Sequence, residues 1–99
     1  MADPYAQLFE GLEFSAPEGT VVARVKNGPQ AESGGRIVYL LWFYDKEGIP
    51  IEDNLTLVLS REAFDRDKEG AYKREAIAKV QHWLAGVRDG ESVEFLGSA

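Results

Sequence analysis

The sequence predicts an α+β fold in which a three- to four-stranded, mainly antiparallel sheet has one long C-terminal helix packed on one face. A short N-terminal helix precedes the strands, so the expected order is α-β-β-β-α-β. Three observations support this prediction. The chain has 99 residues, enough for one compact core. Apolar residues fill both faces of a strand across residues 36–44, alternate with a period of two across residues 55–59, and recur at helical spacing across residues 71–87. We therefore treat residues 1–99 as a single α+β domain.

The N-terminal segment has the features of a short helix. Asp3 can cap free backbone amides, and Pro4 suits the first helical position. Four apolar residues then recur at i, i+3, i+4 and i+7, which places them on one helical face: Tyr5, Leu8, Phe9 and Leu12. A helix this short is unstable alone. We therefore expect it to dock this apolar face on the sheet.

The first predicted strand covers residues 20–26 and is followed by a long loop. Residues 27–35 contain Pro29 and the pair Gly34 and Gly35, which interrupt regular structure. We expect this stretch to form a mobile hairpin loop.

The second and third predicted strands surround a tight turn. Residues 36–44 are apolar on both faces, so we expect a central strand that is covered on both sides. Residues 45–48 read Asp-Lys-Glu-Gly and predict a hairpin turn. Pro50 removes one backbone donor, which predicts edge-like or bulged backbone beside it. Residues 55–59 then alternate leucine with other residues and form the third strand.

A helical region and a final strand complete the chain. Ser60 can cap a short helix near residues 61–67, and Gly70 separates it from the main helix at residues 71–87. One bent helix is the alternative. The final strand, residues 92–96, is expected to return beside the first strand by a right-handed crossover. The predicted buried stripe of the main helix is Tyr72, Ala76, Ile77, Val80, Trp83, Leu84 and Val87.

Composition excludes several classes of protein. The chain contains no cysteine, which excludes disulfides, thiolate metal sites and thiol catalysis. It shows no signal-peptide pattern and no apolar run long enough to span a bilayer, so we predict a cytoplasmic protein without a membrane partner. The formal net charge is −6, and residues 1–59 hold nine acidic and four basic residues. This acidic balance disfavours a large phosphate-binding surface.

Few residues suggest catalysis or metal binding. His82 is the only histidine, and we expect it to be exposed on the main helix without the partner and pocket that a catalytic base needs. Asp65, Asp67 and Glu69 have the spacing of part of a calcium loop, but the basic residues between them would repel a cation. We therefore predict no enzyme activity, no cofactor and no metal site.

A surface for interaction is predicted on the sheet. Aromatic residues are concentrated in residues 36–44, and basic residues lie at its start and on the neighbouring strand. The main helix can cover only one face of the sheet. If the N-terminal helix leaves the second face open, an apolar patch remains of the kind that binds other proteins. The predicted interaction surface consists of Val22, Arg24, Lys26, Arg36, Tyr39, Trp42, Tyr44 and Val58.

Two functions from different classes follow from this surface. The preferred hypothesis is a small acidic protein-interaction module, a binder, adaptor or inhibitor, with a protein partner or a second copy of itself. One version is an inhibitor whose carboxylates imitate nucleic-acid phosphates. The alternative is a single-stranded nucleic-acid-binding protein, in which sheet aromatics stack on bases and strand-borne arginine and lysine bind phosphates.

One resemblance bears on the alternative. Residues 36–83 comprise an aromatic strand, an Asp-x-x-Gly turn, a leucine-rich strand and a following helix. This run resembles the single-strand-binding domains of a family of transcriptional coactivators. The resemblance covers about half the chain, and this sequence lacks the dense basic residues of that family. It implies a similar arrangement of elements and no residue roles.

Overall fold

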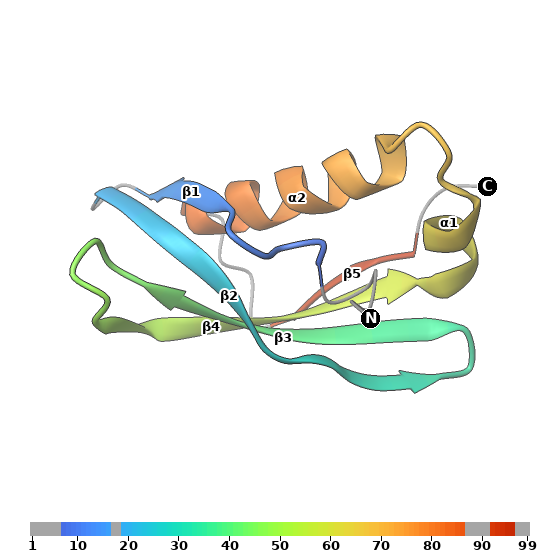
Figure 1. Cartoon of the computed structure of the whole chain (residues 1–99), viewed down its shortest axis with the longest axis horizontal. Helices are drawn as coiled ribbons and strands as arrows, with labels where there is room; N and C mark the ends of the chain where they lie inside the picture. Colours follow the sequence, from blue (N-terminus) through green and yellow to red (C-terminus); the bar gives the residue numbers. More distant parts are fainter. Residues whose placement is uncertain (1–6, 17–18, 87–91, 97–99) are drawn as a thin grey trace.

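The chain folds as a curled five-stranded sheet that holds one main helix on its inner side (Figure 1). The computed structural model describes residues 7–16, 19–86 and 92–96, without the side chains of residue 20 and residues 26–33. The elements in chain order are β1 (Glu13–Ala16), β2 (Gly19–Ser33), β3 (Arg36–Tyr44), β4 (Pro50–Ser60), α1 (Arg61–Arg66), α2 (Ala71–Leu84) and β5 (Ser92–Phe95).

The sheet is mixed, and its strands follow one another in sequence order from β1 to β5. The pairs β1–β2, β2–β3 and β3–β4 are antiparallel, whereas β4–β5 is parallel. The predicted fold class is therefore wrong. The order is β-β-β-β-α-α-β instead of α-β-β-β-α-β, the sheet has five strands instead of three or four, and the main helix is shorter than predicted, Ala71–Leu84.

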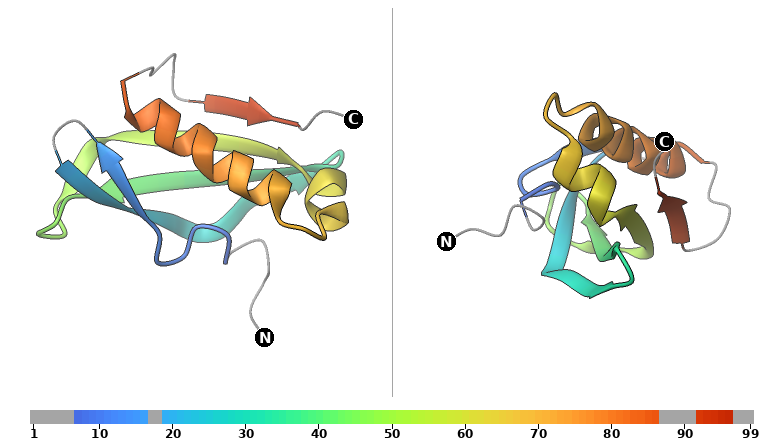
Figure 2. Two further views of the ribbon diagram at one scale, coloured as in Figure 1. Left: turned by 90° about the horizontal axis from the view of Figure 1, so that it is seen from above. Right: turned by 90° about the vertical axis from the view of Figure 1, so that its right-hand side faces the viewer.

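The final strand lies beside β4, and the prediction that it returns beside the first strand is wrong. Two parallel strands need a connection of about a dozen residues or more between them. The helical region between β4 and β5 provides this connection and passes over one face of the sheet (Figure 2). Because β1 already occupies the far edge, β5 takes the free edge next to β4.

The prediction of an N-terminal helix is also wrong for the residues that the structure describes. Residues 7–11 form a turn, and residues 13–16 form β1; Asp3, Pro4 and Tyr5 lie outside the described residues. Phe9 is fully buried, with its ring centroid 5.4 Å from that of Tyr39 in an edge-to-face contact. The apolar residues of this segment therefore join the core from a turn, on the same side of the sheet as α2.

The predicted mobile loop is mostly strand. β2 continues to Ser33, and the hairpin is confined to Gly34 and Gly35, whose φ angles are +61° and +76°. Register shifts on both sides of Pro29 accommodate the missing amide donor. Positive φ at two successive glycines suits a two-residue hairpin, which explains why the ladder can extend so far.

β3 is the middle strand of the sheet, as predicted, but it is not covered on both sides. Its side chains alternate between fully buried and half-buried along the strand. The helix and the turn at residues 7–11 lie over the same face, so the other face keeps partial exposure. The buried side chains of β3 are Ile37, Tyr39, Leu41 and Phe43, and those of β4 are Leu55, Leu57 and Leu59.

The turn between β3 and β4 is confirmed. The Asp45 carboxylate accepts hydrogen bonds from the amides of Glu47 and Ile49, each at 2.9 Å. Gly48 has a φ of +81°. Pro50 lies opposite Tyr44, next to a register shift, so the predicted bulged backbone is also confirmed.

The break between the two helices is confirmed as well. The Ser60 hydroxyl caps α1 by accepting from the amide of Ala63 at 3.2 Å. Gly70 precedes α2 with a φ of +79° and has no side chain for capping. Asp67 caps α2 instead, because its carboxylate accepts from the Lys73 amide at 2.9 Å.

α2 packs a narrow apolar stripe on the sheet. Its fully or nearly fully buried residues are Ala76, Val80, Trp83 and Leu84, whereas Tyr72 and Ile77 are half-buried and residue 87 lies outside the described part. The Trp83 ring stacks on Phe43 with centroids 5.8 Å apart. Among the described residues, no helix has the length and apolarity needed to cross a membrane.

Two polar contacts hold α2 against both edges of the sheet. The Tyr72 hydroxyl accepts from the Ser60 amide at 2.7 Å and donates to the Phe95 carbonyl at 2.6 Å. Its ring stacks on Phe95 at 4.8 Å, and burial raises the pKa of Tyr72. At the other edge, the Gln81 amide group accepts from the Ser15 amide at 3.0 Å and donates to the Ser15 carbonyl. The helix therefore joins β1 to β5.

Substitution Tyr72→Phe tests the first of these contacts. It leaves the Ser60 amide and the Phe95 carbonyl without their partner, so we expect the free energy of unfolding to fall by about 1–3 kcal/mol in urea denaturation. Tyr44→Phe, on the other face of the sheet, serves as the control and should change stability by less than about 0.5 kcal/mol. If both substitutions lower the free energy of unfolding by the same amount, the Tyr72 hydroxyl does not stabilise the fold through its bridge.

Asp67 predicts a pH dependence of stability. Desolvation acts to raise the pKa of Asp67, but hydrogen bonds from the backbone amides of Lys73, Tyr72 and Gly70, together with the positive charge of Lys73, outweigh it, and the pKa lies below its ordinary value. Because the pKa of Asp67 is lower in the folded state, its carboxylate stabilises the fold fully at pH values above its ordinary pKa of about 4. This stabilisation is lost as the pH falls through the lower pKa of the folded state.

Asp67→Asn should therefore be less stable than the wild type at pH 7, and the difference should shrink as acid protonates Asp67. Urea denaturation at a series of pH values measures it. Asp65→Asn is the control, because it removes the same charge from an exposed ion pair with Arg61, at 3.6 Å. A difference between Asp67→Asn and the wild type that stays constant down to pH 2 would contradict the capping role.

Candidate interaction surface

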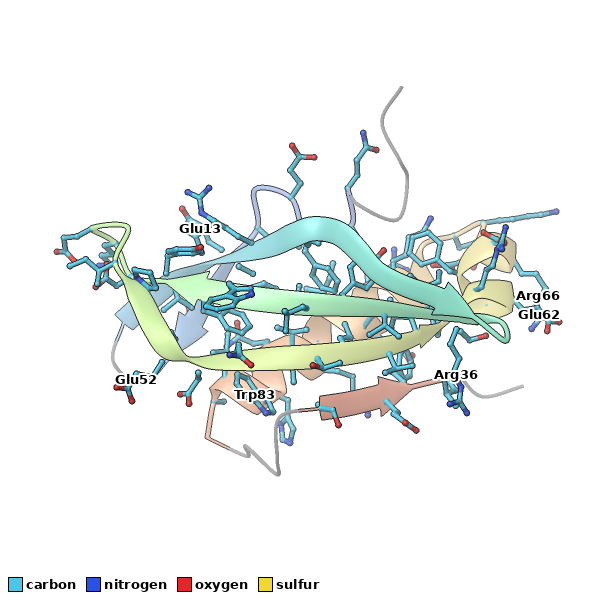
Figure 3. All side chains as sticks on the ribbon, turned by 90° about the horizontal axis from the view of Figure 1, so that it is seen from below. Glu13, Arg36, Glu52, Glu62, Arg66 and Trp83 are labelled. Carbon is cyan, nitrogen blue, oxygen red and sulfur yellow. The ribbon has the colours of Figure 1, made fainter. Side chains whose placement is uncertain are left out.

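The face of the sheet turned away from α2, here called the outer face, carries apolar and aromatic side chains with three polar ones among them. Figure 3 looks onto this face from below the sheet. Every apolar member is half-buried, in contrast to the fully buried side chains on the opposite face. The outer face comprises Val22 and Arg24 of β2, Val38, Leu40, Trp42 and Tyr44 of β3, and Asn54, Thr56 and Val58 of β4.

The strand register brings these residues together. Val38 lies opposite Val58, and Leu40 lies opposite Thr56. Trp42 has Asn54 on one side and Arg24 on the other. Directly opposed residues on one face have Cβ atoms about 5 Å apart, so these residues are neighbours on the surface. The result is an apolar band that runs along β3.

Most of the predicted surface residues lie on the outer face or at its end. Val22, Arg24, Trp42, Tyr44 and Val58 belong to it. Arg36 is exposed at the first position of β3, opposite Ser60. Lys26 lies in β2, but its side chain is outside the described part of the structure.

Tyr39 lies on the opposite face and does not belong to the outer face. It is fully buried against Phe9. Successive side chains of a strand point to opposite faces, so Tyr39 cannot share a face with Trp42 and Tyr44. The predicted set omitted Val38 and Leu40, although the same alternation along residues 36–44 identifies them.

Charged groups border the apolar band. The Arg24 guanidinium lies 5.2 Å from the ring centroid of Tyr44, a cation–π arrangement on the outer face. Glu13 of β1 lies opposite Val22, and Glu94 of β5 lies opposite Val58 in the register. Glu52 is exposed near the start of β4. An apolar centre with a rim of both charge signs is typical of protein-binding surfaces.

The side of the molecule that carries α2 has fewer features of a functional site. His82 is exposed on α2, in a shallow surface hollow of about 420 Å³ that it shares with Glu75, Ala78 and Lys79. Asp67 is engaged in capping α2. Within residues 7–16, 19–86 and 92–96, no group of three or more histidine, aspartate or glutamate side chains could hold a metal ion.

Comparison with protein-family models, with curated proteins and with solved structures finds no match to this chain. Its function is therefore argued from the outer face itself.

Proposed function

We propose that this chain is a protein-interaction module that binds its partner through the outer face. The observation that carries the proposal is the apolar band along β3, which α2 leaves uncovered in the described part of the structure. α2 packs on the opposite face (Figure 2), where Phe9 contacts the buried ring of Tyr39. The band contains Trp42 and Tyr44, and Arg24 borders it; tryptophan, tyrosine and arginine are the residue types that contribute most to binding at protein interfaces.

The energetics favour a covered outer face. Removing 100 Å² of apolar surface from water stabilises a complex by about 2.5 kcal/mol. Association itself costs roughly 4–15 kcal/mol in lost translational and rotational freedom. A partner must therefore cover several hundred Å² of this face, which means most of the band and not one aromatic side chain.

The rim favours a protein partner over imitation of nucleic-acid phosphates. The carboxylates of Glu13, Glu52 and Glu94 are interleaved with the guanidinium groups of Arg24 and Arg36. An imitation of phosphates would need a row of negative charges without such cations. We therefore propose an apolar binding surface with a mixed polar rim.

Photo-crosslinking tests the proposal. Benzoylphenylalanine is placed at position 40 in the centre of the outer face, and at position 78 on the exposed side of α2 as the matched control. In cells that express the full chain, we expect position 40 to form defined adducts with protein and position 78 to form few. Adducts are detected by denaturing electrophoresis and mass spectrometry. No adducts from position 40, or equal yields from both positions, would contradict the proposal.

A single-stranded nucleic-acid binder is the second candidate. The observation that favours it is the cation–π pair of Arg24 and Tyr44 on the same face as Trp42, since bases stack on aromatic rings beside cations. The acidic residues of the rim weigh against it.

Tryptophan fluorescence decides between the candidates. Trp83 is buried on the core side, so Trp83→Phe leaves Trp42 as the only reporter. A nucleic-acid binder would show quenching of Trp42 by single-stranded DNA or RNA at low salt, and the quenching would weaken steeply as salt rises. For the protein-interaction module we expect no quenching at any salt concentration.

A further inference from the structure

We infer that the partner on the outer face is a second copy of this chain, which packs face to face across a twofold axis. This inference rests on the proposed function and specifies its partner. A twofold interface uses the same patch on both copies, so the patch must be complementary to itself. The outer face meets this condition in both its apolar centre and its charged ends.

The apolar centre is symmetric about Leu40, the midpoint of β3. A twofold axis that lies between the two sheets, perpendicular to the strands and beneath Leu40, reverses the direction of β3 in the second copy. Leu40 then faces Leu40, and Val38 of one copy faces Trp42 of the other. A small side chain thus meets a large one on each side of the axis, as close packing requires.

Arg36 and Glu52, two exposed residues of opposite charge, lie near opposite ends of the outer face, with Glu94 and Arg24 also at its border. Arg36 begins β3, and its side chain is exposed at one end. Glu52 is exposed at the other end, near Tyr44 and the start of β4, and Figure 3 shows Glu52 and Arg36 at opposite ends of the sheet. The same axis therefore brings Arg36 of each copy toward Glu52 of the other, beside the pair of Arg24 and Tyr44. Two equivalent ion pairs close the interface at its rim.

The available area indicates a dimer of moderate affinity. Three strands of about eight residues and the four residues of β5, at about 4.8 Å between strands and 3.3 Å per residue, give a face of roughly 450 Å². β1 curls away with α2, as its contact through Gln81 shows, and contributes little. Two copies would bury on the order of 1,000 Å², at the low end of specific interfaces. We expect a dimer that dissociates in the micromolar range.

Analytical ultracentrifugation of the full chain between about 1 µM and 1 mM tests the inference, with micromolar dissociation expected from the interface size. The wild type should change from monomer to dimer across this range. Arg36→Glu and Glu52→Arg should each raise the dissociation constant about tenfold or more, because like charges then meet at both ends. The double variant restores opposite charges in the reversed sense, so its dissociation constant should return to within about threefold of the wild-type value.

Arg66→Glu and Glu62→Arg are the matched controls. They make the same changes in net charge at an exposed ion pair of α1, away from the outer face, and should leave the dimer unchanged. Circular dichroism verifies that each variant is folded.

The outcomes separate this inference from the proposed function. A wild type that stays monomeric to 1 mM, while position 40 crosslinks to a different protein, would overturn the second copy as partner and leave the interaction module in place. A monomer without adducts from position 40 would overturn both. A dimer that is insensitive to Arg36→Glu and Glu52→Arg would overturn the twofold arrangement on the outer face.

Discussion

The packing of α2 on one face of the sheet is the interaction on which the rest of the structure depends. A helix with one apolar stripe can cover one face only, and the stripe formed by Val80, Trp83 and Leu84 meets the buried side chains of β3 and β4. Tyr72 fixes the helix to β5, and Gln81 fixes it to β1. The strands at the two edges are thereby tied to the same helix, and the sheet curls around it (Figure 1).

This one-sided packing links the fold to the proposed function. Each apolar residue that β3 turns toward the helix has a neighbour that it turns away, and those neighbours include Leu40 and Trp42. The helix therefore stabilises the fold without hiding the outer face. The formal net charge of −6 opposes non-specific association of copies, so contact through this face depends on matched shape and on the few charges at its ends, Arg36 and Glu52.

Local signals were predictable from the sequence, and long-range pairing was not. The break at Gly70 and the turn that begins at Asp45 depend on neighbouring residues, and both were predicted. The N-terminal segment failed because its helical spacing of apolar residues also suits a turn that inserts Phe9 beside Tyr39. The extension of β2 through Pro29 depends on register shifts in its pairing with β3, and these cannot be identified from the residues of β2 alone. For the interaction surface, the alternation of side chains along a strand is sufficient to place Tyr39 and Trp42 on opposite faces of the sheet.

The difference in solvent access between the two tryptophans tests the central claim, a sheet covered on one face only. Acrylamide quenching is measured at low protein concentration in Trp83→Phe, which reports on Trp42, and in Trp42→Phe, which reports on Trp83. The structure predicts that acrylamide quenches the half-buried Trp42 several-fold more efficiently than Trp83, whose exposed fraction is 4%. Equal quenching of the two residues, or stronger protection of Trp42, would contradict an open outer face.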